Sequence, residues 1–219
     1  MKISIAIPTY EYKGEGELFL THLINTITMQ THSDYEVIIS DQSINDKIQN
    51  LILCLSDPKI IYFKTNEKLG NISYNTNNAI KHCSGDIIKV MHQDDFFATK
   101  YALELINNAM IKNPNKKWGA TGFDHCTNNT NITKNKMVGA CNPSTSFFIN
   151  DKNNLDLYDE NFFYLLDGDF HKSLTKKYGD PIIINDICIT VRQHGSQASH
   201  FYRDREALER EALKIKFNN

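Results

Sequence analysis

Hydrophobic residues in the first half of the chain form short apolar runs that alternate with stretches of helical spacing. Residues 2–7 alternate apolar and polar side chains up to Pro8, whereas residues 17–30 carry leucine and isoleucine along one helical face. The pattern predicts strands at Lys2–Ile7, Glu36–Ser40, Lys59–Phe63 and Asp86–Met91, separated by helices at Glu17–Gln30, Asp46–Leu55 and Ile72–His82. Such repeated strand–helix units are typical of parallel strands joined by right-handed crossovers.

The alternation ends near Pro114, after which strands and helices are mixed. We expect helices at Tyr101–Lys112, Asp169–Tyr178 and Arg203–Lys216, and strands at Lys117–Phe123, Ser146–Ile149 and Ile182–Val191. Residues 127–136 are polar and are predicted to be irregular. In the terminal helix Leu208, Ala212 and Ile215 share one face, which we expect to pack inward. Without a repeat or a linker, the pattern predicts one α/β domain with three layers and a mostly parallel central sheet.

The composition narrows the functional class. Of the 219 residues, 41% are hydrophobic and 23% are charged, as in a globular protein with a substantial core. A net charge of -2 without any basic stretch argues against nucleic acid as a partner. No apolar run approaches the ~20 residues of a membrane span, and the five scattered cysteines fit a reducing compartment. We therefore expect a cytoplasmic protein with no transmembrane segment and at most peripheral membrane contact.

Polar or aromatic residues follow each strand of the first half. In open α/β sheets ligands bind beyond the carboxyl ends of the strands. These ends are Pro8–Tyr10, Asp41–Ser43, Lys64–Asn66 and His92–Asp95. At the last of them Asp94 and Asp95 are adjacent, and two carboxylates repel each other unless a cation or hydrogen bonds neutralise them. A divalent metal ion with open coordination positions would do so and would also bind a diphosphate. The alternative is that one of the two aspartates caps the next helix.

The order of these motifs resembles family-2 glycosyltransferases of the GT-A fold. The segments are I-P-T-Y at the first strand end, Q-T in the first helix–strand turn, D-x-S after the second strand, and G-D-I-I-K-x-x-x-Q-D-D after the fourth. The resemblance covers most of the chain and is densest over residues 3–97. It implies a single Rossmann-like domain, in which residues 1–97 bind a nucleotide sugar and residues 98–219 supply the acceptor site and a catalytic base.

The resemblance implies a role for each matching residue on the donor side. Pro8, Thr9 and Tyr10 would line the base pocket, with the ring of Tyr10 as a stacking face. Asp41 would accept a hydrogen bond from the base, although an Asx-turn with Ser43 is an equal alternative. The resemblance places Asp94 near the ribose and Asp95 on Mn²⁺ or Mg²⁺ at the diphosphate. In the helix after Gly70, Thr76 and Asn77 occupy the region where relatives often have Ala-Arg-Asn, and Asn75 or Asn77 would approach the nucleotide.

Two departures from the family pattern concern the metal and the base. His92 replaces the first aspartate of the usual Asp-x-Asp motif, and Ser40-Asp41-Gln42-Ser43 keeps only one carboxylate of the usual D-D-G-S. The segment Val191–Ser199 is similar to one that folds back near the diphosphate in relatives. His194 could therefore bind the metal or a phosphate oxygen, and Arg192 could donate charge-assisted hydrogen bonds to phosphate or acceptor.

The acceptor side is implied by two further segments. The N-P-S segment is similar to the acceptor wall of relatives, so Asn142 and Ser144 are candidate acceptor contacts, although an ordinary turn explains them as well. The segment Leu165–Phe170 matches the family position of a general base, which would be Asp167. Inverting transfer needs such a group, because the attacking hydroxyl loses its proton as the new bond forms. Asp169 would cap the helix or hold the acceptor.

The function expected from these residues is inverting transfer of a sugar from a nucleotide-diphosphate sugar, with UDP favoured. The acceptor hydroxyl would belong to a growing polysaccharide, a lipid-linked sugar or a protein glycan. A non-catalytic sugar-nucleotide-binding or scaffold protein is the main alternative. A nucleotidyltransferase is a third, but those enzymes place a basic glycine-rich loop after the first strand, and residues 9–17 are acidic and aromatic.

Overall fold

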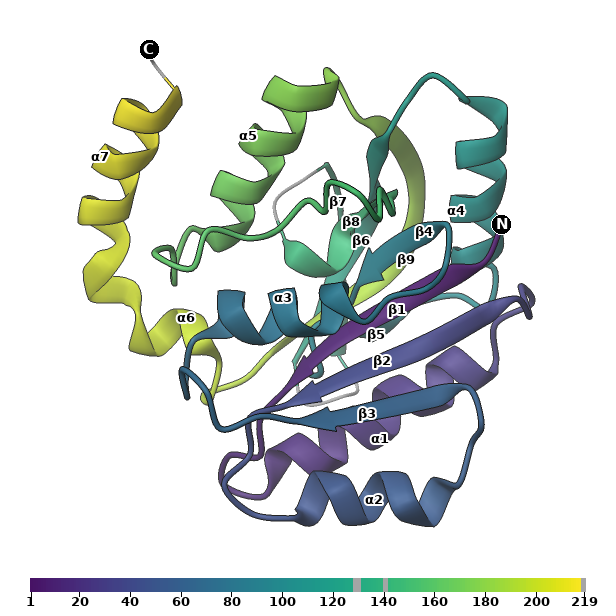
Figure 1. The fold of residues 1–219 in the computed structure, drawn as a ribbon, viewed down its shortest axis with the longest axis vertical. Coiled ribbons are helices and arrows are strands. Elements are labelled where there is room, and N and C mark those ends of the chain that lie inside the picture. Colours follow the sequence, from purple (N-terminus) through teal and green to yellow (C-terminus); the bar gives the residue numbers. More distant parts are fainter. Residues whose placement is uncertain (128–130, 140–141, 218–219) are drawn as a thin grey trace.

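A single curled sheet runs through the molecule (Figure 1). The computed structural model describes residues 1–127, 131–139 and 142–217. Its strands are β1 (Ile3–Thr9), β2 (Tyr35–Asp41), β3 (Ile60–Lys64), β4 (Ile87–Val90), β5 (Phe96–Phe97), β6 (Trp118–Thr127), β7 (Asn131–Val138), β8 (Ser146–Ile149) and β9 (Ile182–Gln193). The order across the sheet is β3-β2-β1-β4-β8-β6-β9-β5, with β7 paired to β6.

The first four strands of the chain are parallel, as the alternation predicts. β1 pairs with both β2 and β4, and β2 pairs with β3, all in parallel register. In the second half β8 lies antiparallel between β4 and β6, whereas β9 runs parallel to β6. The sheet is therefore parallel through the first half and mixed through the second, and it is continuous between the halves.

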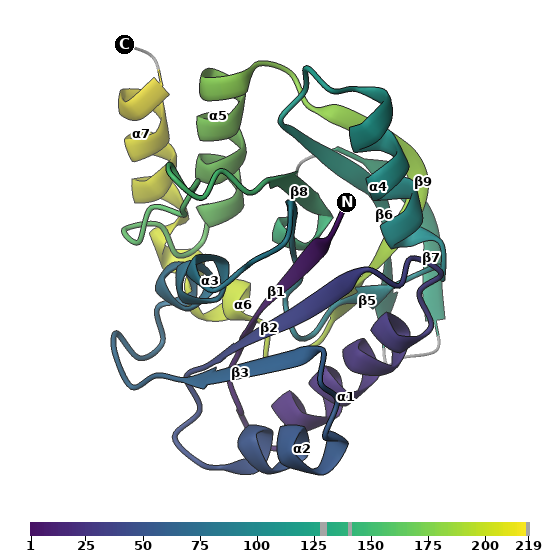
Figure 2. The same cartoon turned by 45° about the vertical axis from the view of Figure 1, so that its right-hand side comes forward.

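The helices form a layer on each face of the sheet (Figure 2). They are α1 (Glu15–Thr28), α2 (Lys47–Leu55), α3 (Ile72–Lys81), α4 (Ala102–Lys112), α5 (Leu166–Tyr178), the short α6 (Ala198–Phe201) and α7 (Glu206–Phe217). One core cluster joins apolar residues of α1, α2 and α4 to one face of the sheet, and a second joins those of α3, α5 and α7 to the other face. The predicted three-layer α/β arrangement is confirmed.

Three local predictions are wrong. Residues 131–138 form β7 rather than an irregular stretch, because their backbone pairs with β6; residues 128–130 of that stretch lie outside the described part of the chain. Helix α5 begins at Leu166 instead of Asp169, so Asp167 lies in its first turn. In α7 the predicted inward face is exposed, with Leu208 at 70% and Ile215 at 63%, because the opposite face carries Leu213 into the core shared with α5.

The arrangement of strands brings the predicted site together at one edge of the sheet. β1, β2 and β4 run parallel, so Thr9, Asp41 and the turn at 92–95 emerge at the same edge. The end of β9 reaches the same region, since its partner β5 follows that turn directly. Among the helices that the structure describes, none has the length and apolar character needed to cross a bilayer.

Candidate active site

Two adjoining cavities open at the carboxyl ends of the central strands. The first has a volume of about 360 Å³ and the second about 180 Å³. Four residues belong to both walls: Ile72, His92, Asp94 and Ala198. The turn that follows β4 thus contributes to the walls of both cavities, which suits a reaction between two substrates.

The first cavity has an aromatic wall. Pro8, Thr9 and Tyr10 line it, as predicted, and so do Tyr12 and Tyr202, which sequence reasoning missed. The rings of Tyr10 and Tyr12 stack with centroids 6.5 Å apart. The Tyr202 hydroxyl donates a 2.9 Å hydrogen bond to the carbonyl of Gly70, linking the residue after α6 to the loop before α3. Flat aromatic faces of this kind suit a nucleobase.

Gln93 fastens the loop after β1 to the turn after β4. Its side-chain amide donates to the Tyr10 carbonyl at 2.8 Å, and its carbonyl oxygen accepts the Tyr10 N–H at 2.9 Å. This reciprocal pair holds the backbone of Tyr10 in one place beside Asp94. Gln93 therefore helps to fix the position of the aromatic wall.

Asp41 does not face either cavity in the described structure, contrary to the prediction that it contacts the base. It is fully buried and accepts hydrogen bonds from the Ser43 N–H at 2.8 Å and the Tyr62 hydroxyl at 2.7 Å, so both of its oxygens are used within the chain. The Asx-turn alternative is the one observed. Gln42 lines the first cavity instead, with its amide donating to the carbonyls of Glu67 and Lys68.

Asn77 is likewise turned away from the first cavity. Its side chain is buried, accepting the Tyr158 N–H at 2.7 Å and donating to the Tyr158 carbonyl at 2.9 Å. Residues two apart on a helix point about 200° apart. Asn75 therefore occupies the opposite side, where it lines the cavity and donates to the Thr9 carbonyl at 3.0 Å.

Asp94, not Asp95, is the carboxylate that meets His194. Asp94 Oδ2 lies 3.0 Å from His194 Nε2, and Asp94 lines both cavities. Burial alone would raise the pKa of Asp94, but the hydrogen bond from His194 holds it below its usual value. Asp95 is 3% exposed and accepts the Arg192 N–H, and burial followed by the charge of Asp94 raises its pKa. Asp95 lines the second cavity, so its metal role stays a prediction, and Asp94 is a further candidate beside His194.

Arg192 supports this turn from behind. It is buried, with its guanidinium 4.7 Å from the ring centroid of Phe19, and it lies in neither cavity wall. Its Nε donates to the Asp94 carbonyl at 2.9 Å and its Nη2 to His22 Nδ1 at 2.9 Å. These contacts are internal to the protein, and the predicted contact of Arg192 with phosphate or acceptor stays a prediction.

Asp94 and His194 are the side chains that would hold a divalent cation here, in place of the 3.0 Å hydrogen bond between Asp94 Oδ2 and His194 Nε2. His92 Nε2 is buried without a hydrogen-bond partner, and burial lowers the pKa of His92, which favours a neutral ring. Within the described ranges no three acidic, histidine or cysteine side chains form a metal cluster. Mg²⁺ often takes only one or two protein ligands together with substrate phosphates.

The second cavity holds the predicted base. Asp167 lines it from the first turn of α5, and burial raises the pKa of Asp167 to about 6. Asn142 also lines this cavity, whereas Ser144 is fully buried and accepts the His92 N–H at 3.0 Å. The predicted acceptor contact of Ser144 is therefore corrected to a support of the turn after β4.

Asp169 is not in the wall of the second cavity either. It is 2% exposed and forms a 2.7 Å ion pair with Lys216 of α7. The reason is again helical geometry, because Asp167 and Asp169 point to opposite sides of α5. Asp169 attaches α5 to α7 and does not cap α5 or face an acceptor.

Comparisons with known proteins bear on the family and on the fold. The model of glycosyl transferase family 2 matches residues 4–179. Over 148 residues the chain is 26% identical to an Escherichia coli enzyme, UDP-Glc:alpha-D-GlcNAc-diphosphoundecaprenol beta-1,3-glucosyltransferase WfgD, covering 64% of this chain and 56% of that protein. Over 96 residues it is 27% identical to GalNAc(5)-diNAcBac-PP-undecaprenol beta-1,3-glucosyltransferase of Campylobacter jejuni, covering 43% of this chain and 30% of that protein. The chain thus spans about half or less of these relatives.

Two solved structures share the fold. TarS of S. aureus (residues 1–349, in complex with UDP-GlcNAc) has a TM-score of 0.72 at 16% identity, covering 91% of this chain and 61% of that one. Mannosyltransferase PcManGT from Pyrobaculum calidifontis, in complex with GDP-Man and Mn²⁺, has a TM-score of 0.67 at 13% identity, covering 94% and 61%. The predicted GT-A fold is confirmed.

Proposed function

Because the chain belongs to glycosyl transferase family 2, we propose that it transfers a sugar from a nucleotide-diphosphate sugar to an acceptor hydroxyl, with inversion at the anomeric carbon. The observation that carries this proposal is the position of Asp94 at the junction of two cavities, one aromatic and one containing Asp167. A donor in the first and an acceptor in the second would meet beside Asp94.

The first cavity suits the nucleotide half of the donor. The rings of Tyr10 and Tyr12 offer stacking faces for a base, and Asp94 and His194 also line this cavity. Mn²⁺ or Mg²⁺ bound by Asp94 and His194 would neutralise the charge of the departing diphosphate. UDP is the favoured nucleotide, since the E. coli relative is named for UDP-Glc and TarS was solved with UDP-GlcNAc.

The second cavity suits the acceptor. Its wall carries Asp167, whose pKa of about 6 leaves the carboxylate ionised at neutral pH yet basic enough to take a proton from a hydroxyl. Attack from this side would place the incoming oxygen opposite the diphosphate. The two bacterial relatives are named for undecaprenol-linked acceptors, so a lipid-linked sugar is the preferred acceptor class here. A cytoplasmic location with peripheral membrane contact remains a prediction.

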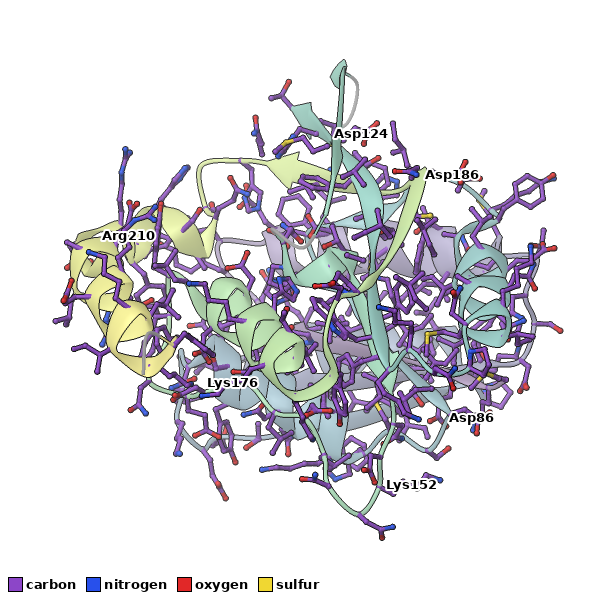
Figure 3. All side chains as sticks on the ribbon, turned by 90° about the horizontal axis from the view of Figure 1, so that it is seen from above. Asp86, Asp124, Lys152, Lys176, Asp186 and Arg210 are labelled. Carbon is purple, nitrogen blue, oxygen red and sulfur yellow. The ribbon has the colours of Figure 1, made fainter. Side chains whose placement is uncertain are left out.

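The donor site can be tested by thermal shift. Wild type, Asp94→Asn and, as a control, Asp186→Asn would be heated with UDP, GDP, dTDP or CMP in Mn²⁺, Mg²⁺ or EDTA. Asp186 is exposed and lines neither cavity (labelled in Figure 3). A ligand at 100 times its Kd stabilises the native state by about 2.7 kcal/mol. We expect a metal-dependent shift with one diphosphate in wild type and Asp186→Asn that is lost in Asp94→Asn.

The outcomes separate the proposal from its alternatives. If no nucleotide stabilises the wild type under any metal condition, the donor site is wrongly assigned. If a nucleotide binds but the matching sugar nucleotide gives neither transfer nor nucleotide release with a panel of lipid-linked acceptors, the protein is a sugar-nucleotide-binding protein and not an enzyme.

A further inference from the structure

Glu209 is a buried carboxylate on a helix that is otherwise largely solvated. On α7 its neighbours Leu208 and Arg210 are exposed, whereas Glu209 is 3% exposed. An ionised carboxylate away from water is costly unless hydrogen bonds and opposite charge compensate it. Its partners therefore show what the side chain does.

The partners are three consecutive backbone N–H groups in another part of the chain. Glu209 Oε1 accepts from Phe163 N at 3.0 Å, and Oε2 accepts from Tyr164 N at 2.9 Å and Leu165 N at 2.8 Å. Hydrogen bonds to an ionised acceptor are about twice as strong as neutral ones. Arg205 adds compensation, with its Nε 3.6 Å from Oε1 and its guanidinium 4.1 Å from the ring centroid of Phe163.

These three residues lead directly into the helix that carries Asp167. Leu165 is the N-cap of α5 and provides no side-chain cap, so the start of the helix depends on an acceptor from elsewhere. A negative charge is also favourable at the N-terminus of a helix. Glu209 supplies both from a position 44 residues later in the chain than Leu165.

The same segment forms part of the second cavity. Phe163 and Tyr164 line it together with Leu166 and Asp167. A second attachment keeps α7 in register with α5, because Lys216 pairs with Asp169 at 2.7 Å and with Asp159 at 2.8 Å. Figure 3 shows α7, where Arg210 is labelled, running beside α5. Helix α7 is thus joined to the acceptor side through Glu209 at residues 163–165 and through Lys216 at Asp169.

We propose that Glu209 is a positioning residue for the acceptor site: by binding the N–H groups of residues 163–165 it holds the first turn of α5, and with it Asp167, in the geometry that transfer requires. This inference rests on the proposed function of the second cavity. Under this proposal α7 contributes to binding and reaction of the acceptor in the second cavity. Donor binding in the first cavity does not depend on Glu209.

The test compares Glu209→Gln with Glu211→Gln, an exposed position on the same helix. Glutamine keeps the size of the side chain but has only one acceptor oxygen. Its NH₂ group is a donor and cannot accept a hydrogen bond from a backbone N–H. For Glu209→Gln we expect nucleotide affinity within about twofold of wild type and a fall of roughly 10- to 100-fold in kcat/KM for the acceptor, as misplacement of reacting groups produces. The pH below which kcat falls should be lower in Glu209→Gln, because water that reaches Asp167 reduces the effect of burial on its pKa. Glu211→Gln should match wild type in each measurement.

Amide hydrogen exchange gives a readout that does not depend on activity. In Glu209→Gln the amides of residues 163–165 should exchange faster, while those of β1 and β4 keep wild-type rates. Arg205→Met, which removes the neighbouring charge and the contact of the guanidinium with the Phe163 ring, should give a smaller effect in the same direction and serves if Glu209→Gln does not fold. Wild-type exchange at 163–165, or unchanged acceptor KM, kcat and pH profile in Glu209→Gln, would overturn the proposal. Failure of the wild type to transfer any sugar would count against the proposed function, while the exchange measurement would still decide whether Glu209 holds the segment.

Discussion

Asp94 and Asp167 are both carboxylates of the candidate site, but their surroundings move their pKa values in opposite directions. The hydrogen bond from His194 holds the pKa of Asp94 below its usual value despite burial, and desolvation raises the pKa of Asp167 to about 6. Groups whose environments separate their pKa values in this way commonly divide the roles of charge stabilisation and proton transfer. Asp94 thus suits a cation and a diphosphate, and Asp167 suits a base.

Asp167→Asn should abolish transfer and stabilise the fold. Loss of a general base lowers kcat by about 10²- to 10⁴-fold, with donor affinity unchanged. Wild-type kcat should fall as pH drops below about 6, where Asp167 becomes protonated. A raised pKa means that the stability contribution of Asp167 is full below the unfolded pKa and is lost as pH rises through 6. The variant should therefore match wild type near pH 4 and exceed it by about 1–3 kcal/mol above pH 7 in urea titrations. Equal stability at pH 7.5 would show that Asp167 is well solvated.

At the scale of the element, the 3.6-residue turn decides which of two nearby polar residues faces the site. On α3 Asn75 lines the first cavity, while Asn77 forms hydrogen bonds with the backbone of Tyr158. On α5 Asp167 lines the second cavity, while Asp169 pairs with Lys216. In both helices the residue that does not line a cavity binds a neighbouring segment instead. On each helix one of the two residues lies in a cavity wall and the other holds a neighbouring segment, although Asn75 also bonds to Ser40 and Thr9 within the chain.

Asn77→Ala should therefore lower stability without weakening nucleotide binding. It would leave the buried N–H and carbonyl of Tyr158 without their partner, which costs about 1–3 kcal/mol for each group. Thermal unfolding should show a lower Tm, and titration with the preferred nucleotide should give an unchanged Kd. Asn75→Ala is the matched comparison on the same helix, and we expect it to weaken nucleotide binding. A reversed result would return Asn77 to the donor site.

At the scale of the whole molecule, the sheet and both cores extend across the two halves of the chain. β4 pairs with β8, and one core cluster joins residues of α1 and β1 to residues of β9. The second cluster joins Ile38 and Ile80 of the first half to Trp118 and Phe170 of the second. Neither half has a separate core, so the donor and acceptor regions are parts of one structural unit.

Unfolding should therefore be a single transition. Trp118 is the only tryptophan in the sequence and is 1% exposed in β6, so its fluorescence reports the second half alone. Far-UV circular dichroism reports the helices of both halves. In urea the two signals should give the same midpoint, as a two-state domain requires. Distinct midpoints would indicate that residues 1–97 and 98–219 unfold independently.

The sequence determined the elements and their order, because hydrophobic periodicity and turn residues are local properties. The turn at His92–Asp95 was singled out by adjacent carboxylates that are visible in the chain itself, and Asp167 by the resemblance of its segment to the family. The sequence missed β7, whose strand conformation comes from pairing with β6.

Only the tertiary structure decided the direction in which each side chain points and which distant groups meet. Several polar residues of the predicted site bind partners within the protein that are distant in the sequence. They are Asp41, Asn77, Ser144, Asp169 and Arg192. Glu209 gave no signal in the sequence, because its role depends on backbone N–H groups more than 40 residues away. Burial and pairing at long range are set by the packed fold, so composition and spacing cannot specify them.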